Sequence, residues 1–349
     1  MPEIEPENAE LYIEENIAYE EEKSMHPHTS TVPVMPQLSV ALGLLVCVFS
    51  VTYIGATKSM TKLEKDNVTV ETALASHAEK AESLSAVFDD VTLRAKSAIV
   101  WDVQGQRVLF NKNADDTRPL ASITKLMTAL VSYELLDPRD TVAITPNALR
   151  VEGDSGFADG ETFTMQDLSD ITLISSSNDG ASALSREAGR VVGEDADPEA
   201  VFIRAMNLKA QELGLTKTRF ANSTGLDLSP TEAGAYGSAR DVALLMEYII
   251  TNVTDAVALT NLDIATIGNK EGAYHTAKNT NEVVDSIDGL IASKTGYTEL
   301  SGGNLVVAAN VGLNRPIIVV VLGSSQDERF TDTLELLDRA KLYIAKADE

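Results

Sequence analysis

A stretch without any charged residue separates a polar N-terminal segment from the rest of this chain. It covers residues 38–56 and reads LSVALGLLVCVFSVTYIGA. About 20 consecutive apolar residues let a helix cross the hydrocarbon core of a bilayer. A few serine and threonine residues weaken the pattern, and a buried core helix is the alternative. Because nothing nearby in the sequence could bury such a helix, we predict a retained transmembrane anchor at residues 37–56.

The charges around this stretch bear on its orientation. Lys58, Lys62 and Lys65 follow it, whereas Lys23 is the one lysine or arginine before it. Positively charged flanks tend to stay in the cytoplasm, which would place the C-terminal side of the span there. Long domains, however, are translocated largely regardless of charge. Both orientations therefore stay open at this point. A cleaved signal peptide fits less well, because the preceding residues are acidic rather than basic.

Three further regions flank the predicted anchor. Residues 1–36 are polar and acidic, which is typical of a disordered tail. Residues 57–92 form a polar stalk, whose weak helical stripe leaves the oligomeric state undetermined. Residues 93–349 have the pattern of one globular domain. The stripe of the stalk consists of Leu74, Ala78, Ala81 and Phe88.

Charge and composition argue against a nucleic-acid partner, an intrachain disulfide and a zinc site. The net charge is -25 and the sequence pI is about 4.5, with no basic patch of the kind that neutralises phosphates. We therefore expect no nucleic acid as a partner. The single cysteine, Cys47, rules out an intrachain disulfide. The four histidines have no zinc-site spacing in the globular part, so no metal site is predicted.

The hydrophobic pattern of the globular part predicts an α+β fold. Strands are expected at 98–103, 108–110, 305–309 and 317–322, the first two as a hairpin. Strands at both ends with helices between them predict an antiparallel sheet built from N- and C-terminal strands, with flanking helices and a helical lobe.

Helix signals fill the region between these strands. Asp197 and Pro198 form an N-cap and first-turn pair before a helix over 200–213, and Ser238 begins another helix that runs to 250. A closing helix is expected after the last strand, because its apolar residues recur at helical spacing. The residues that share this face are Leu334, Leu337, Ala340 and Ile344.

The first group of residues that could carry chemistry is Ser122-Ile123-Thr124-Lys125. If a helix begins near Ser122, then Ser122 and Lys125 lie three residues apart on one face. A lysine in apolar surroundings loses affinity for its proton, and a neutral lysine can turn serine into a nucleophile. The alternative is a serine N-cap followed by a solvated lysine.

A second group is Ser176-Ser177-Asn178, which follows the apolar run 171–174. Ser176 could shuttle a proton, and Asn178 could contact an amide of a substrate peptide. The alternative is an ordinary turn between two helices.

A third group is Lys294-Thr295-Gly296, which leads into a strand. Glycine lets a ligand backbone approach a strand closely. Lys294 would attract a carboxylate and Thr295 could hydrogen-bond it. The alternative is an edge strand with an exposed lysine.

The three groups together carry more weight than each alone. Ser-x-x-Lys, Ser-x-Asn and Lys-Thr-Gly, in that order, are the set found in β-lactamases and penicillin-binding proteins. Over roughly residues 95–345 the sequence resembles the D-alanyl-D-alanine carboxypeptidases, the low-molecular-mass penicillin-binding proteins of the S11 peptidase family. The other segments that carry this resemblance are 117–128, 220–227, 236–241 and 279–281.

The resemblance implies a two-lobed fold of the β-lactamase/transpeptidase type, with the site in the cleft between the lobes. It implies a serine peptidase in which Ser122 forms an acyl-enzyme, Lys125 acts as base and water releases the shortened peptide. The substrate would be the D-Ala-D-Ala end of a peptidoglycan peptide, and β-lactams would be covalent inhibitors. No metal or organic cofactor is implied. The catalytic domain would lie outside the cytoplasm, held to the cell membrane by the N-terminal anchor.

The resemblance also assigns roles around the cleft. Ser176 and Asn178 would flank it, and the terminal carboxylate of the substrate would bind Lys294 and Thr295. The backbone N–H groups of Ser122 and Tyr297 would form the oxyanion hole. The residues implied to contact substrate are Asn178, Lys294, Thr295, Gly296 and Tyr297.

Three features depart from the family pattern. The middle motif usually reads Ser-Gly-Asn, and Ser177 takes the glycine position here; because serine is small, we expect function to survive. Many members carry a second all-β domain and a C-terminal amphipathic anchor, whereas the anchor predicted here is N-terminal. The acidic tail and the charges around the anchor are unusual for an exported enzyme.

Other functions share the three motifs. A class A β-lactamase needs a loop glutamate to activate the deacylating water, and that glutamate would fall near Thr224, where no acid stands; Glu212 and Asp227 do not fit. We therefore expect slow deacylation and penicillin sensitivity. A DD-endopeptidase would use the same chemistry on cross-links. A non-enzymatic membrane-tethered scaffold is the third alternative, against which the intact motifs argue.

Overall fold

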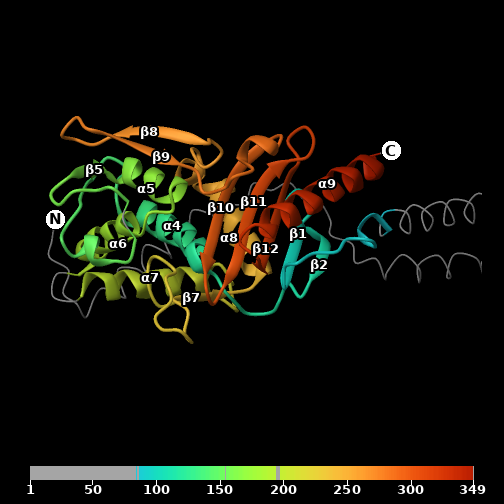
Figure 1. Cartoon of the computed structure of the whole chain (residues 1–349), viewed down its shortest axis with the longest axis horizontal. Coiled ribbons are helices and arrows are strands. Elements are labelled where there is room, and N and C mark those ends of the chain that lie inside the picture. The colour runs from blue at the N-terminus through green and yellow to red at the C-terminus, as the bar shows by residue number, and fades with distance from the viewer. Residues whose placement is uncertain (1–83, 85, 154, 194–196, 349) are drawn as a thin grey trace, which may run out of the picture. The chain divides into compact units, whose positions relative to one another are not determined.

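Strands from both ends of the globular part pair into one sheet, as the sequence predicts. The computed structural model describes residues 84, 86–153, 155–193 and 197–348. The five strands of its main sheet are antiparallel and lie in the order β10-β11-β12-β1-β2 (Figure 1). The α+β architecture is thereby confirmed. The strands are β1 Ser97–Asp102, β2 Arg107–Lys112, β10 Leu290–Thr298, β11 Gly302–Asn310 and β12 Pro316–Ser324.

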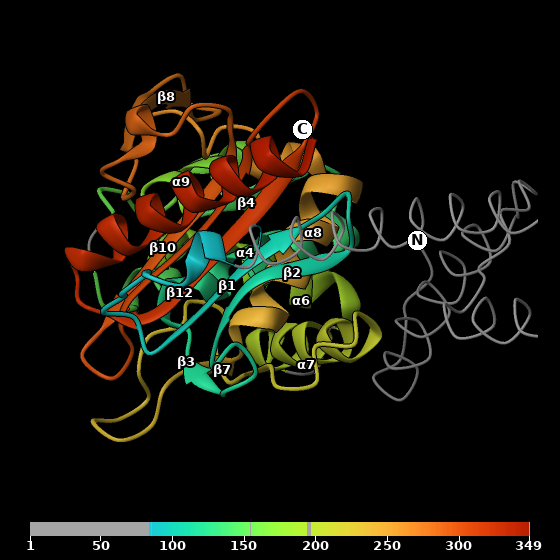
Figure 2. The same cartoon turned by 90° about the vertical axis from the view of Figure 1, so that its right-hand side faces the viewer.

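Helices cover both faces of this sheet, which explains why its central strand β12 is apolar and buried at almost every position. Val319 and Val321 face the core that contains α9 (Glu328–Asp348). Side chains alternate between the faces of a strand, so Ile318 and Val320 point to the other face, where α8 (Ala239–Asn252) packs (Figure 2). The predicted face of the closing helix is confirmed, because Leu337, Ala340 and Ile344 are buried against the sheet and Leu334 packs at the edge of the same core.

A helical lobe lies beside the sheet (Figure 1). Its helices are α4 Lys125–Leu135, α5 Met165–Ile174, α6 Asn178–Val192 and α7 Pro198–Glu212. The predicted caps are confirmed, since Asp197 accepts from the backbone N–H of Glu199 and Ser238 accepts from that of Asp241.

Short strands form small sheets outside the main sheet. They pair as β3 (Arg118–Pro119) with β7 (Ala235–Gly237), β7 with β6 (Arg219–Phe220), β4 (Thr141–Ala143) with β5 (Thr162–Thr164), and β8 (Ile264–Gly268) with β9 (Tyr274–Lys278). Single 3-10 turns are η2 Ala86–Phe88, η3 Ala121–Thr124, η4 Ala148–Arg150, η5 Thr254–Val257 and η6 Val284–Ser286.

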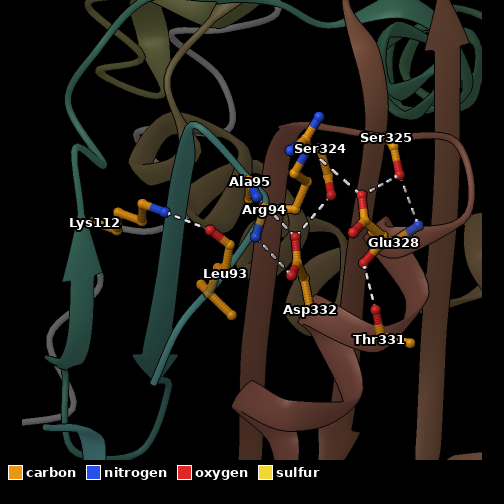
Figure 3. Close-up of polar contacts among 9 residues, drawn as sticks. All are labelled: Leu93, Arg94, Ala95, Lys112, Ser324, Ser325, Glu328, Thr331 and Asp332. Carbon is orange, nitrogen blue, oxygen red and sulfur yellow. Dashed lines mark hydrogen bonds and ion pairs between the residues drawn. The ribbon is translucent and has the colours of Figure 1, made fainter. Parts of the chain in front are cut away.

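The segment that leads into β1 is tied to the first turns of α9 (Figure 3). The buried carboxylate of Asp332 accepts from the backbone N–H groups of Arg94 (3.0 Å) and Ala95 (2.8 Å) and from Ser324 Oγ (2.7 Å). Ser325 Oγ accepts from the backbone N–H of Glu328 (3.0 Å) and so caps the helix. Because hydrogen bonds to a carboxylate are stronger than neutral ones, this junction fixes where α9 begins against the end of β12.

The folded part begins upstream of residue 93, where the sequence placed its start. Val87 and Phe88, assigned above to the stalk, are buried in the core under α9. The ring of Phe88 lies 5.4 Å from that of Phe110 and 6.2 Å from that of Tyr343. These partners are distant in sequence, so the local pattern could not reveal them.

The predicted tail, the anchor and the stalk up to residue 83 lie outside the described residues. Within the described part of the chain, no helix has both the length and the apolar character needed to cross a bilayer.

Candidate active site

Ser122 lies on the turn η3, which runs directly into α4. The α-helix thus begins at Lys125 rather than at Ser122, but the spacing of three still brings the two side chains together. Nζ of Lys125 is 3.0 Å from Oγ of Ser122. Just before the serine, Ala121 has a φ of 47°, a backbone conformation that is uncommon for residues with a Cβ. Such a conformation persists only where its surroundings hold it.

Lys125 is completely buried, and its amine contacts two further oxygen atoms. Nζ donates to Oδ1 of Asn178 (2.7 Å) and to the backbone carbonyl of Thr224 (2.9 Å). Burial lowers the pKa of Lys125 to about 7, because the charged form loses its hydration. A neutral amine has two N–H groups and one lone pair. Since both carbonyl oxygens can only accept, they take the two N–H groups and leave the lone pair directed at Ser122.

The rate of acylation of Ser122 is therefore expected to rise with pH through an apparent pKa near 7. Lys125 is a base only when deprotonated, and its pKa of about 7 leaves half of it neutral near pH 7, whereas an ordinary lysine is almost entirely charged there. Below the pKa the rate should fall about tenfold per pH unit. The measurement is the acylation rate by benzylpenicillin on both sides of neutrality, with circular dichroism to verify folding. A rate that does not change with pH would contradict the assignment of the base.

The middle motif connects the two lysines of the site. Oγ of Ser176 accepts from Nζ of Lys294 (2.9 Å). Asn178, the first residue of α6, accepts from Lys125 and donates through Nδ2 to the backbone carbonyl of Glu152 (2.7 Å). Ser176 thus lies next to Lys294, and Asn178 next to Lys125. Ser176 also has a positive φ of 61°, so the backbone is strained at this position as well.

Ser177, which departs from the family pattern, has a structural role here. Its Oγ accepts from the backbone N–H of Gly180 (2.9 Å), which makes it the N-cap of α6. The same hydroxyl donates to Oγ of Ser155 (2.6 Å). A serine in the glycine position thus starts the helix that carries Asn178.

Lys294 lies in β10, the edge strand of the main sheet. The alternative of an exposed edge lysine is wrong, because only 1% of Lys294 is exposed. Burial, together with the positive charges of Lys125 and Arg329, holds the pKa of Lys294 well below its ordinary value. Next to it, Oγ1 of Thr295 is 2.6 Å from Oγ1 of Thr280. An anionic group of a ligand placed beside this buried amine and hydroxyl would stabilise the protonated form of Lys294.

Gly296 lets β10 approach the turn that carries Ser122. A Cβ at this position would lie 2.8 Å from the carbonyl oxygen of Leu120 and 3.1 Å from the backbone nitrogen of Ser122. The next residue, Tyr297, points its side chain outward and is 41% exposed. The structure therefore brings the eight residues singled out in the sequence into one region, between η3 with α4, the start of α6 and strand β10. Their individual roles stay predictions.

Three contributors to this region could not be recognised in the sequence. The carbonyl of Thr224 contacts Lys125, but a backbone group leaves no trace in residue identity. Arg329 of α9 is 6% exposed and donates through Nη1 to the carbonyl oxygen of Gly296 (3.1 Å), although a charged residue in the first turn of a helix is usually solvated. Asn304 of β11 donates to two carbonyl groups just before Ser122. Among the described residues, no group of three or more His, Cys, Asp and Glu side chains is placed to hold a metal ion.

Comparison with known proteins agrees with this geometry. Residues 80–326 match the model of the D-alanyl-D-alanine carboxypeptidase family, Peptidase_S11. The chain belongs to this S11 family. The resemblance inferred from the three motifs is thereby confirmed.

Individual S11 relatives show how far the likeness extends. D-alanyl-D-alanine carboxypeptidase DacF of Bacillus subtilis is 32% identical over 252 residues, which are 70% of this chain and 62% of the relative. The chain thus spans less than two thirds of the length of this relative. A D-alanyl-D-alanine endopeptidase of Haemophilus influenzae is 36% identical over 217 residues, 61% of this chain and 69% of the relative. Penicillin-binding protein D2 of Listeria monocytogenes, solved in its ampicillin-bound form, superposes with a TM-score of 0.59 at 29% identity and covers 72% of this chain and 98% of its own.

Proposed function

We propose that this protein is a serine-type DD-carboxypeptidase that removes the terminal D-Ala from peptidoglycan stem peptides. The observation that carries the proposal is the fully buried amine of Lys125, which lies 3.0 Å from Oγ of Ser122. In its neutral form this amine has two N–H groups, and both donate hydrogen bonds to carbonyl oxygens. Such an amine removes the hydroxyl proton as the serine attacks. S11 membership supports the same chemistry.

The reaction follows from this arrangement. Oγ of Ser122 attacks the carbonyl carbon of the penultimate D-Ala while its proton passes to Lys125. The oxyanion accepts hydrogen bonds from the backbone N–H groups of Ser122 and Tyr297. The C–N bond then breaks, and the leaving amine takes up a proton, for which Ser176 provides a relay. Water hydrolyses the ester and restores the free serine.

Recognition of the substrate in this proposal relies on its C-terminal carboxylate. Lys294 and Thr295 would bind it, with the positive charge of Arg329 behind the strand. A chain end that lacks the carboxylate leaves this buried positive region uncompensated, which disfavours binding.

The experiment that tests the proposal is intact-mass spectrometry of the full-length chain after incubation with benzylpenicillin. We expect a persistent penicilloyl adduct located on the peptide that contains Ser122. Loss of the drug without an adduct would indicate a β-lactamase instead. Neither adduct nor loss of drug from folded protein would favour the non-enzymatic scaffold.

The persistence of the adduct follows from the surroundings of Lys125. The position at which a class A β-lactamase would need its glutamate is near Thr224, which offers a carbonyl group to Lys125. Burial accounts for the lowered pKa of Lys125. Without a carboxylate to activate water, hydrolysis of the acyl-enzyme is slow.

A DD-endopeptidase is the second candidate, and the 36% identity to the Haemophilus influenzae endopeptidase favours it. Both activities use one acyl-enzyme chemistry, and they differ in the group that leaves. The purified protein should be given a D-Ala-D-Ala pentapeptide and a cross-linked dimer at equal concentration. Faster release of D-Ala from the pentapeptide supports the carboxypeptidase, and faster cleavage of the dimer supports the endopeptidase.

The proposal includes the location of the enzyme. Residues 38–56 would anchor it in the cell membrane, with the catalytic domain outside the cytoplasm where peptidoglycan lies. Protease added to intact spheroplasts should then digest the catalytic domain. Protection of the domain in intact spheroplasts, with digestion after lysis, would contradict this orientation.

A further inference from the structure

The backbone directly before the nucleophile is held by two buried side chains. Nδ2 of Asn304, on β11, donates to the carbonyl oxygens of Pro119 and Leu120, both at 3.0 Å. Oγ1 of Thr124 donates to the carbonyl oxygen of Ala121 (2.7 Å). Three successive carbonyl groups ahead of Ser122 are thus each fixed by a side chain.

Asn304 is itself fixed by the sheet. Its side chain is completely buried, and its Oδ1 accepts from the backbone N–H of Gly323 on β12 (2.8 Å). Its two N–H groups and its carbonyl oxygen are therefore all in use, so the amide has no freedom to rotate. The turn η3 is in this way connected rigidly to the inner strands β11 and β12.

This connection acts at a strained point of the backbone. Ala121, with its φ of 47°, would relax if its neighbours were released. All peptide bonds of this region are trans, and in a trans peptide the C=O and N–H groups point in opposite directions. Fixing the carbonyl group of Ala121 therefore sets the direction of the N–H group of Ser122.

We propose that Asn304 is a positioning residue for acylation. Together with Thr124 it holds the strained turn, so that Oγ of Ser122 faces Lys125 while the N–H of Ser122 faces the developing oxyanion. The inference rests on the proposed function, since it concerns the same serine. A displacement of about 1 Å at such a site lowers the rate by about 100-fold.

The chain offers a matched control in Asn207. Its Nδ2 donates to the carbonyl oxygens of Ile203 (2.9 Å) and Phe220 (2.8 Å), and its Oδ1 accepts from the N–H of Phe220 (2.9 Å). This is the same set of three hydrogen bonds, made away from the nucleophile turn. Changes at Asn207 thus report the structural cost of losing such an amide.

The test compares Asn304→Asp with Asn207→Asp in the full-length protein. Aspartate keeps the size of asparagine and the acceptor oxygen, but an ionised carboxylate cannot donate. We expect Asn304→Asp to slow the first-order acylation step with benzylpenicillin by about 10- to 100-fold and to leave the preceding reversible binding constant unchanged. Affinity for a D-alanine boronic acid analogue, whose adduct with serine is tetrahedral, should fall in parallel. Asn207→Asp should lower the melting temperature without changing the acylation rate or the affinity for the boronic acid.

The outcomes separate this inference from the proposed function. An acylation rate in Asn304→Asp equal to wild type, or an equal loss in Asn207→Asp, would overturn the positioning role and leave the proposed function standing. Absence of any adduct in wild-type protein would overturn both. If Asn304→Asp does not fold, Thr124→Val, which keeps the shape of the side chain and removes the bond to Ala121, must slow acylation in the same way. An unchanged rate in that variant would overturn the inference.

Discussion

Replacement of Ser122 by alanine is expected to abolish labelling by benzylpenicillin and to lower D-Ala release by about 10⁴- to 10⁶-fold. The hydroxyl of Ser122 is the group to which the amine of Lys125 is directed at 3.0 Å, so its removal takes away the atom that would form the acyl bond. The side chain is only partly buried, and we expect the free energy of unfolding to change by less than about 1 kcal/mol. Intact-mass spectrometry and thermal melting measure the two effects.

A suitable control for this variant is Ser132→Ala on α4, the helix that follows the turn η3. Ser132 is fully buried, and its hydroxyl donates to the carbonyl oxygen of Thr128 (2.8 Å), away from the nucleophile. This variant loses an equivalent hydroxyl and should still acquire the adduct. If Ser122→Ala released D-Ala at the wild-type rate, the nucleophile would have to be another residue.

Replacement of Lys125 by methionine is the second change with a large expected effect. Methionine fills nearly the same volume and cannot accept a proton, so acylation should slow by about 10²- to 10⁴-fold. Asn178 and Thr224 each lose a donor, which costs about 1–3 kcal/mol for a buried acceptor left without a partner. Removal of a buried amine that must otherwise be desolvated offsets part of this cost. The loss of rate should therefore far exceed the loss of folded protein at 25 °C.

The pH profile makes the test of Lys125 specific. Wild-type acylation should rise through an apparent pKa near 7, whereas the residual rate of Lys125→Met should lack this step. The profile is measured as the first-order rate of adduct formation at saturating drug. A variant that kept the step near 7 would show that another group is the base, and Lys125→Ala should behave like Lys125→Met.

Those parts of the fold that follow from local patterns could be predicted from the sequence. Strand β12 contains the β-branched run 317–321. Asp197 and Ser238 are good caps because their hydrogen bonds form with residues only two and three positions further along the chain. The three motifs could be recognised for a related reason. Each is a short run whose residue types suit one step of the chemistry, and their order narrows the choice of family.

Burial and long-range contacts could not be predicted in this way. Lys294 follows a pattern that also fits an exposed edge lysine, and the packing of the helical lobe against β10 buries it. Val87 and Phe88 belong to the core because Phe110 and Tyr343, which are remote in sequence, lie beside them. Such facts depend on which segments meet, and a single position in the sequence does not contain that information.

The sequence by itself determined the α+β class, the caps of the main helices and the candidates for the reacting side chains, because propensity, periodicity and residue chemistry are local properties. Only the tertiary structure decided the surroundings on which the proposed role of Lys125 as a base depends. Its pKa of about 7 comes from complete burial. The direction of its lone pair comes from Asn178 and from the carbonyl of Thr224, which lies 99 residues along the chain. A proton-accepting lysine therefore arises from the meeting of these segments, since in water the same side chain would be charged.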